Sequence, residues 1–195
     1  MSDQELGPRE RILSAALELF VNQGYFNTNV PDISKHSRCS VGSIYHHFLN
    51  KEEIASKLYE DAFGRFRKAV GEALSDDVDI SHTVRTVVKS FLLFSESHPM
   101  LARYLWLARH NEFLTKQVSK PTVVGFDMLG RKLARVIKTA MRSGEIAPLK
   151  AEVIWSVVFG IPQSYVLDWL DGHSKIPPSE IVDELSEVAW QALRK

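Results

Sequence analysis

Two helix-start signals lie close together in this sequence, and they restrict the fold more than any other feature. At the first, Asn29 precedes Pro31 and Asp32, the pattern of an N-cap residue, a proline in the first turn and an acid near the positive end of the helix dipole. At the second, Ser40 precedes another short helical segment. Two short helices separated by a tight turn predict a helix-turn-helix unit.

Almost every other periodic segment also has helical spacing, and no alternating run of β-branched residues predicts a strand. We expect further helices over these ranges: 8–24, 51–73, 80–97, 100–115, 120–143, 150–170 and 178–194. The helix at 51–73 would be about 33 Å long at about 1.5 Å per residue. The predicted fold class is all-α, with an N-terminal three-helix helix-turn-helix domain (1–51) joined by this long helix to a helical ligand-binding and dimerisation domain (52–195).

The composition is typical of a globular protein, with 45% hydrophobic and 25% charged residues among 195. No apolar run of roughly 18 residues is evident, so we expect no membrane-spanning helix, and the polar N-terminus does not resemble a secretory signal. Cys39 is the only cysteine, which excludes an intrachain disulfide and fits a reducing cytoplasm. We therefore expect a cytoplasmic protein with no membrane association.

The charge of the chain favours nucleic-acid binding only weakly. The whole chain has a net charge of zero, and residues 6–51 contain five basic and three acidic side chains, which leaves +2. Since phosphate neutralisation supplies much of the affinity for DNA, that affinity must depend on where the few charges are placed.

The helix that begins at Ser40 has the features that a major-groove reader needs. Its free N–H groups could meet a phosphate, and Gly42 would let the helix approach the groove closely. Ile44 and Phe48, four residues apart, would pack inward. Ser43 would then face the bases, and the side chains expected to reach phosphates are Tyr45, His46 and Lys51.

Several residues in and near this helix have plainer interpretations. Gly42 could serve only helix packing, and Tyr45 could fill the core. The adjacent His46 and His47 could suggest a metal, but adjacent helical residues point about 100° apart and rarely share an ion, so we expect no metal and we expect His47 to pack against the domain. Cys39 could be a redox sensor at a helix start, although a passive thiol in the turn is favoured.

A longer pattern resembles a known family. Its residues are Arg11-Ile12-Leu13, Ala15-Ala16, Leu19-Phe20, Gly24-Tyr25, Thr28, Ile33, Ser40-x-Gly42-x-x-Tyr45-x-His47-Phe48 and Lys51-Glu52. This string is similar to the N-terminal domain of TetR-family transcriptional regulators. The resemblance implies an all-helical homodimer with DNA-binding N-terminal helices and a variable C-terminal domain that binds a small molecule. It places these residues at or near DNA: Thr28, Ser40, Val41, Gly42, Ser43, Tyr45, His46 and Lys51.

The sequence departs from the family at the turn between the two short helices. Arg38 lies where the family usually has glycine, so it would need a left-handed conformation that costs a non-glycine residue roughly 1 kcal/mol. Ser34 lies where the family commonly has alanine, and serine is small enough to fit.

The 150–170 segment is apolar on nearly every side. A helix of this kind is buried all round, which in a protein of this size predicts a homodimer through residues 150–195 with an isologous helical interface. A monomer in which this helix is central is the alternative. Pro162 should kink the helix, because proline removes a backbone hydrogen bond.

Many aromatic residues and a few polar groups between residues 90 and 170 suggest a small-molecule pocket, although each polar group could equally be structural. The candidate ligand-binding residues are Arg103, Trp106, His110, Phe126, Trp155, Phe159, Gln163 and Trp169.

No catalytic constellation or cofactor motif is evident. We therefore expect a regulator that is not an enzyme, most simply a repressor released from a palindromic operator by a small, largely apolar effector. A DNA-binding regulator without an inducer, controlled by its abundance or by a protein partner, is the alternative, and a small helical enzyme is a remote one.

Overall fold

The structure, a computed structural model, describes residues 6–74, 79–108 and 128–195. Within these ranges the regular secondary structure is helical, as predicted, and the β-pairing consists of an isolated antiparallel bridge between Ile146 and Arg194. The chain forms two compact units. Unit 1 comprises Met1–Phe63 and Arg103–Val118, and unit 2 comprises Gly64–Ala102 and Ser119–Lys195.

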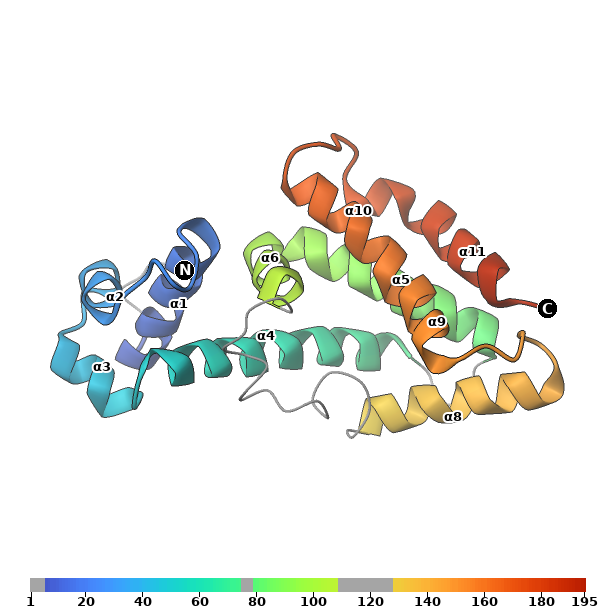
Figure 1. The fold of residues 1–195 in the computed structure, drawn as a ribbon, viewed down its shortest axis with the longest axis horizontal. Coiled ribbons are helices and arrows are strands. Elements are labelled where there is room, and N and C mark those ends of the chain that lie inside the picture. Colours follow the sequence, from blue (N-terminus) through green and yellow to red (C-terminus); the bar gives the residue numbers. More distant parts are fainter. Residues whose placement is uncertain (1–5, 75–78, 109–127) are drawn as a thin grey trace. The chain divides into compact units, whose positions relative to one another are not determined.

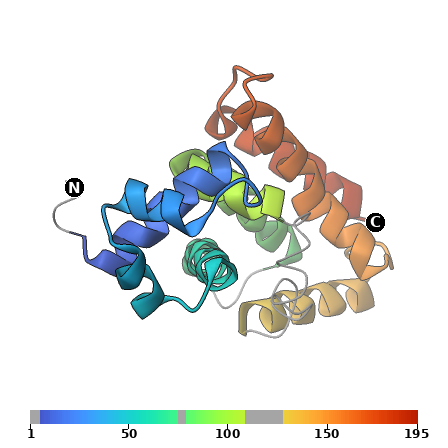
Figure 2. The same ribbon diagram turned by 60° about the vertical axis from the view of Figure 1, so that its left-hand side comes forward.

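Unit 1 contains the predicted helix-turn-helix. Its helices are α1 (Pro8–Asn22), α2 (Val30–Ser37), α3 (Val41–His47), the beginning of α4 (Lys51–Ala73) and the end of α6 (Pro99–Ala108) (Figure 1). The apolar stripe predicted for α1 is its buried face, and its members are Ile12, Ala16, Leu19 and Phe20. Helix α1 packs against α2 and α3 (Figure 2). Ile33 of α2 and Ile44 of α3 are buried and complete the core.

The local signals that predicted these helix ends are confirmed. The Asn29 side chain accepts a hydrogen bond from the N–H of Asp32 at 2.9 Å, and the Asp32 carboxylate accepts one from the N–H of Asn29 at 3.0 Å. This reciprocal capping box satisfies two donors that a helix start otherwise leaves unpaired. Gly24 follows the end of α1 with a φ of 87°, a left-handed conformation that glycine adopts without strain.

Unit 2 is built around α5 (Ile80–Ser97), which contacts several other elements. These elements are α8 (Met128–Ser143), the π-helical turn η1 (Ser156–Gly160), α10 (Ile161–Leu170), the 3₁₀ turn η2 (Pro178–Ile181) and α11 (Val182–Leu193). α9 (Ala151–Trp155) leads into η1. The Arg85 Nε donates to Glu187 at 3.2 Å and its guanidinium lies over the Trp190 ring, so α5 and α11 are joined by charge as well as by apolar packing.

The predicted 150–170 helix differs from a regular α-helix in its middle turn. Residues Ser156–Gly160 are π-helical, and the N–H of Ile161 donates to the carbonyl of Ser156, five residues back. Pro162 follows directly. A proline ring would clash with the carbonyl four residues earlier in an α-helix, and the wider π turn moves that carbonyl aside. The disturbance predicted at Pro162 therefore takes the form of a π-helical turn in the residues before it.

The stretch Ala151–Leu170 is long and apolar enough to pass a length-and-composition test for a membrane span, with a mean hydropathy of 1.2. Our expectation that the sequence contains no apolar run of this length is therefore wrong for this stretch. The finding is weak evidence for a membrane, because apolar helices of globular proteins pass the same test. A buried stripe runs along this stretch through Ile154, Val158 and Val166, and apolar side chains outside it are partly open to solvent.

Candidate DNA interface

Helix α3 is positioned by its cap and by two inward side chains. The N–H of Ser43 donates to the Ser40 hydroxyl at 3.1 Å, so Ser40 is the N-cap that the sequence predicted. Ile44 and Phe48 are 1% and 3% exposed, as their spacing predicted. With these two side chains anchored, the opposite face of α3 is turned to solvent.

That outer face carries most of the predicted DNA-contacting residues of α3. Tyr45 is 53% exposed and Val41 39% exposed. Gly42 and His46 are also exposed, and Ser43 is half-buried. The interpretation of Tyr45 as a core residue is therefore wrong, and its phenol is available to a partner.

Gly42 has no packing reason to be glycine. A Cβ built at this position would meet the Ser40 hydroxyl oxygen at 3.9 Å, which is an ordinary contact. The packing interpretation of Gly42 therefore has no support in the contacts of this chain, and close approach to DNA stays a prediction.

The structure also tests the interpretations of two other side chains near α3, those of His47 and Cys39. His47 is exposed, with its ring 5.2 Å from that of His46 and 6.4 Å from that of Phe48, so the prediction that it packs against the domain is wrong. Among the described residues, no group of three or more His, Cys, Asp or Glu could hold a metal ion. The Cys39 thiol is buried, and a buried thiol is generally unreactive, which supports the passive interpretation.

The turn between α2 and α3 contains a strained residue and a compensating hydrogen bond. Arg38 adopts the predicted left-handed conformation, with φ 55° and ψ 31°. The Ser34 hydroxyl donates to the carbonyl of Cys39 at 2.7 Å, across the turn. Alanine, the commoner residue of the resembling family at this position, could not make this bond. The sequence interpretation treated Ser34 as merely small and so missed this role.

Lys51 and Thr28 are placed inside the domain by their hydrogen bonds. The Lys51 Nζ donates to the carbonyls of Tyr25 at 2.8 Å and of Thr28 at 2.7 Å, and it lies 4.1 Å from the centre of the Tyr25 ring. The Thr28 hydroxyl donates to the carbonyl of Gly24, and the residue is 1% exposed. Both residues were predicted to lie at DNA. These hydrogen bonds hold the α1–α2 turn against the start of α4, and a contact of either residue with DNA stays a prediction.

The same junction contains a tyrosine–carboxylate pair. The Tyr25 hydroxyl donates to Glu52 at 2.9 Å. Burial, followed by the bond to Glu52 and its negative charge, raises the pKa of Tyr25 far above its ordinary value, so the phenol stays protonated. Burial lowers the pKa of Lys51, while the nearby Glu52 charge opposes that shift.

Tyr104 joins the start of α4 to α6 within unit 1, and the sequence interpretation missed this contact. Its hydroxyl donates to the carbonyl of Ala55 at 2.8 Å, and its ring stacks on Phe20 at 6.3 Å. The side chain is buried, which raises the pKa of Tyr104 well above that of a free phenol. A hydrogen bond between residues so distant in sequence leaves no local pattern to detect.

The predicted ligand-binding residues are distributed over both units. Arg103 is half-buried and Trp106 is buried in unit 1, while unit 2 contains Trp155, Phe159, Gln163 and Trp169, all half-buried. The rings of Trp155 and Phe159 stack at 5.2 Å. His110 and Phe126 lie outside the described residues. The structure therefore brings together Trp155 and Phe159, and the pocket as a whole remains a prediction.

A short helix, a tight turn and a capped second helix with an exposed outer face define a helix-turn-helix protein. Comparison with known proteins shows which kind of helix-turn-helix protein this chain resembles. Residues 12–58 match the family model described as bacterial regulatory proteins, tetR family. Residues 12–58 therefore form a TetR-type DNA-binding domain, and the similar proteins, which are transcriptional regulators rather than enzymes, support a TetR-family regulator.

Three similar proteins extend the comparison beyond the N-terminal region. The fatty acid metabolism regulator protein of Bacillus subtilis (strain 168) is 25% identical over 168 residues, which are 85% of this chain and 84% of that protein. The HTH-type transcriptional repressor KstR2 of Rhodococcus jostii (strain RHA1) is 32% identical over 108 residues, 53% of this chain and 52% of that one. The crystal structure of the regulator FadR from Bacillus subtilis in complex with stearoyl-CoA superposes with a TM-score of 0.69 at 20% identity and covers 92% of this chain and 96% of that one.

Proposed function

We propose that this protein is a cytoplasmic transcriptional repressor that binds a palindromic operator as a homodimer and is released by a long-chain acyl-CoA. Repression is supported by the similarity to a named repressor over about half of each chain. Residues 1–51 read the DNA, with Tyr45 as the principal contact from α3, and residues 52–195 bind the effector and form the dimer.

Exposed apolar side chains in the C-terminal region support the dimer. Val153, Ile161 and Val188 are 44%, 40% and 52% exposed, and they belong to α9, α10 and α11. Contiguous exposed apolar patches mark surfaces that meet another protein, and we propose that these side chains contribute to such a patch. A two-fold dimer would present two helix-turn-helix domains to half-sites about 34–36 Å apart, which offsets the low charge of one domain.

The observation that carries the effector class is an aromatic cluster inside unit 2. Phe66 and Phe91 make edge contacts, and Phe159 contacts both, with ring centres 5.9 to 6.4 Å apart. Phe94 joins Phe66 at 5.4 Å. This apolar interior suits an acyl chain, and two of the similar proteins are a fatty acid metabolism regulator and a regulator bound to stearoyl-CoA.

Release would follow from a two-state balance. An effector that binds the DNA-free state tenfold better weakens the operator complex by about 1.4 kcal/mol. Helix α4 has residues in both units, so it is the element that we propose to carry the change.

The test uses a duplex selected from random-sequence DNA by the purified protein. Wild type should bind it tightly, and stearoyl-CoA at micromolar concentration should raise the dissociation constant at least tenfold, as measured by fluorescence anisotropy. Tyr45→Ala should lose the duplex while it remains dimeric in light scattering. Unchanged DNA affinity with every acyl-CoA tested would leave a regulator without this class of inducer.

A further inference from the structure

Helix α8 has an unusual distribution of charge. Its sequence from Met128 to Ser143 contains five basic residues and no aspartate or glutamate, in a chain whose net charge is zero. Four of the basic residues form one row, which we call the α8 basic stripe: Arg131, Arg135, Lys138 and Arg142. At about 100° per residue they fall within an arc of roughly 60°, and all four are exposed.

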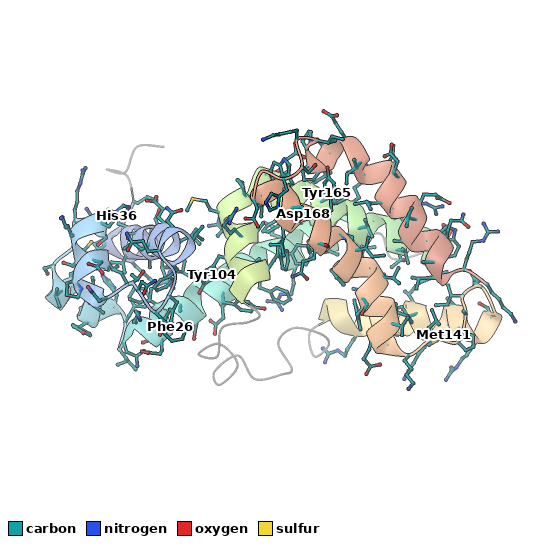
Figure 3. All side chains as sticks on the ribbon, turned by 45° about the horizontal axis from the view of Figure 1, so that its top comes forward. Phe26, His36, Tyr104, Met141, Tyr165 and Asp168 are labelled. Carbon is teal, nitrogen blue, oxygen red and sulfur yellow. The ribbon has the colours of Figure 1, made fainter. Side chains whose placement is uncertain are left out.

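The opposite face of α8 is apolar and directed into unit 2. Leu133 and Ala140 are buried, and Val136, Ile137 and Met141 are half-buried (Met141 is labelled in Figure 3). This packing fixes the rotation of the helix, so the basic stripe is held outward. From Arg131 to Arg142 the stripe is about 16 Å long at about 1.5 Å per residue.

The stripe also lacks the internal pairing that other cations of this protein have. Lys57 pairs with Glu60 and Lys68 with Glu72 on α4, while Arg85 pairs with Glu187. Within the described part of the chain, none of the four stripe side chains makes a hydrogen bond or ion pair. Like charges three and four residues apart repel one another along a helix, and a bound polyanion would relieve that repulsion.

We propose that the α8 basic stripe binds the phosphorylated head group of the effector, while the acyl chain enters the aromatic interior of the same unit. This inference rests on the proposed function and deepens it, since it requires an effector whose head group carries several phosphates. α8 packs against α5, and α5 carries Phe91 and Phe94 of the aromatic cluster. An amphiphile with an apolar chain and a multiply charged anionic end would be complementary to the apolar interior and to the basic stripe. A fatty acid, with a single carboxylate, would leave most of the stripe unpaired.

The test compares two double variants of the full-length protein. Arg135→Gln/Lys138→Gln removes the two central charges of the stripe. Arg65→Gln/Lys68→Gln is the matched control, because these residues are also exposed, also belong to unit 2 and have the same spacing on α4. All side chains concerned are exposed, so both variants should fold, which circular dichroism will check.

Binding of stearoyl-CoA and of stearate is followed by tryptophan fluorescence at two salt concentrations. The stripe variant should bind stearoyl-CoA at least tenfold more weakly than wild type and lose most of the salt dependence, since exposed charges are screened by salt. Its affinity for stearate should be unchanged, and the control variant should match wild type with both ligands. Coenzyme A without an acyl chain should compete with stearoyl-CoA in wild type and fail to do so in the stripe variant.

Three outcomes would overturn the inference, and they are distinguishable. If wild type responds to stearoyl-CoA and the stripe variant responds equally, the stripe is a solvated surface and the proposed function stands. If the stripe variant instead loses affinity for ligand-free operator DNA, the stripe binds nucleic acid. If wild type binds neither stearoyl-CoA nor stearate, the proposed effector class fails and the stripe assignment fails with it.

Discussion

At the scale of single residues, the turn between α2 and α3 shows how one unfavourable residue is accommodated. Arg38 adopts a left-handed backbone conformation that costs a non-glycine residue about 1–2 kcal/mol. The hydrogen bond from the Ser34 hydroxyl to the Cys39 carbonyl spans the same turn and contributes about 1 kcal/mol. The two departures from the family pattern therefore have opposite effects on the stability of the turn.

We expect Arg38→Gly to raise the free energy of unfolding by about 1 kcal/mol and Ser34→Ala to lower it by about 1 kcal/mol. Urea unfolding followed by circular dichroism measures both. The double variant should be close to wild type in stability. A destabilising Arg38→Gly would mean that the arginine side chain makes a stabilising contact that outweighs its backbone strain.

Substitution of Lys51 distinguishes an internal structural role of this residue from a DNA-binding role. The two carbonyls that its ammonium binds hold the α1–α2 turn on α4, so Lys51→Met should lower the free energy of unfolding by about 1–2 kcal/mol. Operator affinity should fall without a change in its salt dependence, measured by anisotropy between low and moderate salt. The salt dependence is the slope of the logarithm of the binding constant against the logarithm of the salt concentration. If this slope instead becomes shallower by about 0.9 for each Lys51 replaced, this lysine neutralises a phosphate, as the family resemblance implies.

Tyr104 predicts a pH dependence of stability. Burial raises the pKa of its phenol in the folded state, so the folded protein holds this proton more tightly than the unfolded chain does. That contribution is complete below the ordinary tyrosine pKa of about 10 and is lost as the pH rises above it. Tyr104→Phe should be about 1 kcal/mol less stable at neutral pH, because it cannot donate to Ala55, and should lose less stability than wild type between pH 9 and 11 in thermal unfolding. Equal losses in the two proteins would contradict this account.

At the scale of secondary-structure elements, α4 is one helix whose residues belong to both compact units, which divide between Phe63 and Gly64. It contains two glycines, Gly64 and Gly71, and a Cβ at either would have no neighbour within 4 Å. Glycine inside a helix is unfavourable relative to alanine, because the unfolded chain has more freedom to lose.

Gly64→Ala and Gly71→Ala should therefore each raise the free energy of unfolding by about 0.5–1 kcal/mol, measured by thermal or urea unfolding. Gly71 lies well inside unit 2 and is the control for Gly64. If Gly71→Ala stabilises the protein and Gly64→Ala does not, α4 needs the freedom of glycine where the two units divide.

Elements differ in how far the sequence predicts them. The caps at Asn29 and Ser40 and the buried stripe of α1 follow from neighbours within one or two helical turns, so the pattern predicts them correctly. The inward direction of Lys51 and the bond from Tyr104 to Ala55 depend on contacts between distant segments, which no local pattern encodes. The π turn before Pro162 lies between these cases, since proline predicts a disturbance but not its form.

At the scale of the whole molecule, the proposed function depends on a second copy of the chain. Val153→Lys/Ile161→Lys places two charges among apolar side chains that we propose to be dimer contacts. We expect a folded monomer in light scattering and a loss of operator affinity of at least a hundredfold. Leu93→Lys on α5, outside residues 150–195 and 37% exposed, is the control and should remain dimeric. A dimeric double variant would place the interface elsewhere.

The contact between Tyr104 and Ala55 limits how such regulators can be recombined. The start of α4 is held both by the α1–α2 turn, through Lys51, and by α6, through Tyr104. A chimaera that exchanges only residues 1–51 keeps Ala55 and Tyr104 but replaces Phe20, on which the Tyr104 ring stacks. Operator specificity should therefore be transferred best to a different effector-binding domain when a compatible aromatic residue is kept at position 20.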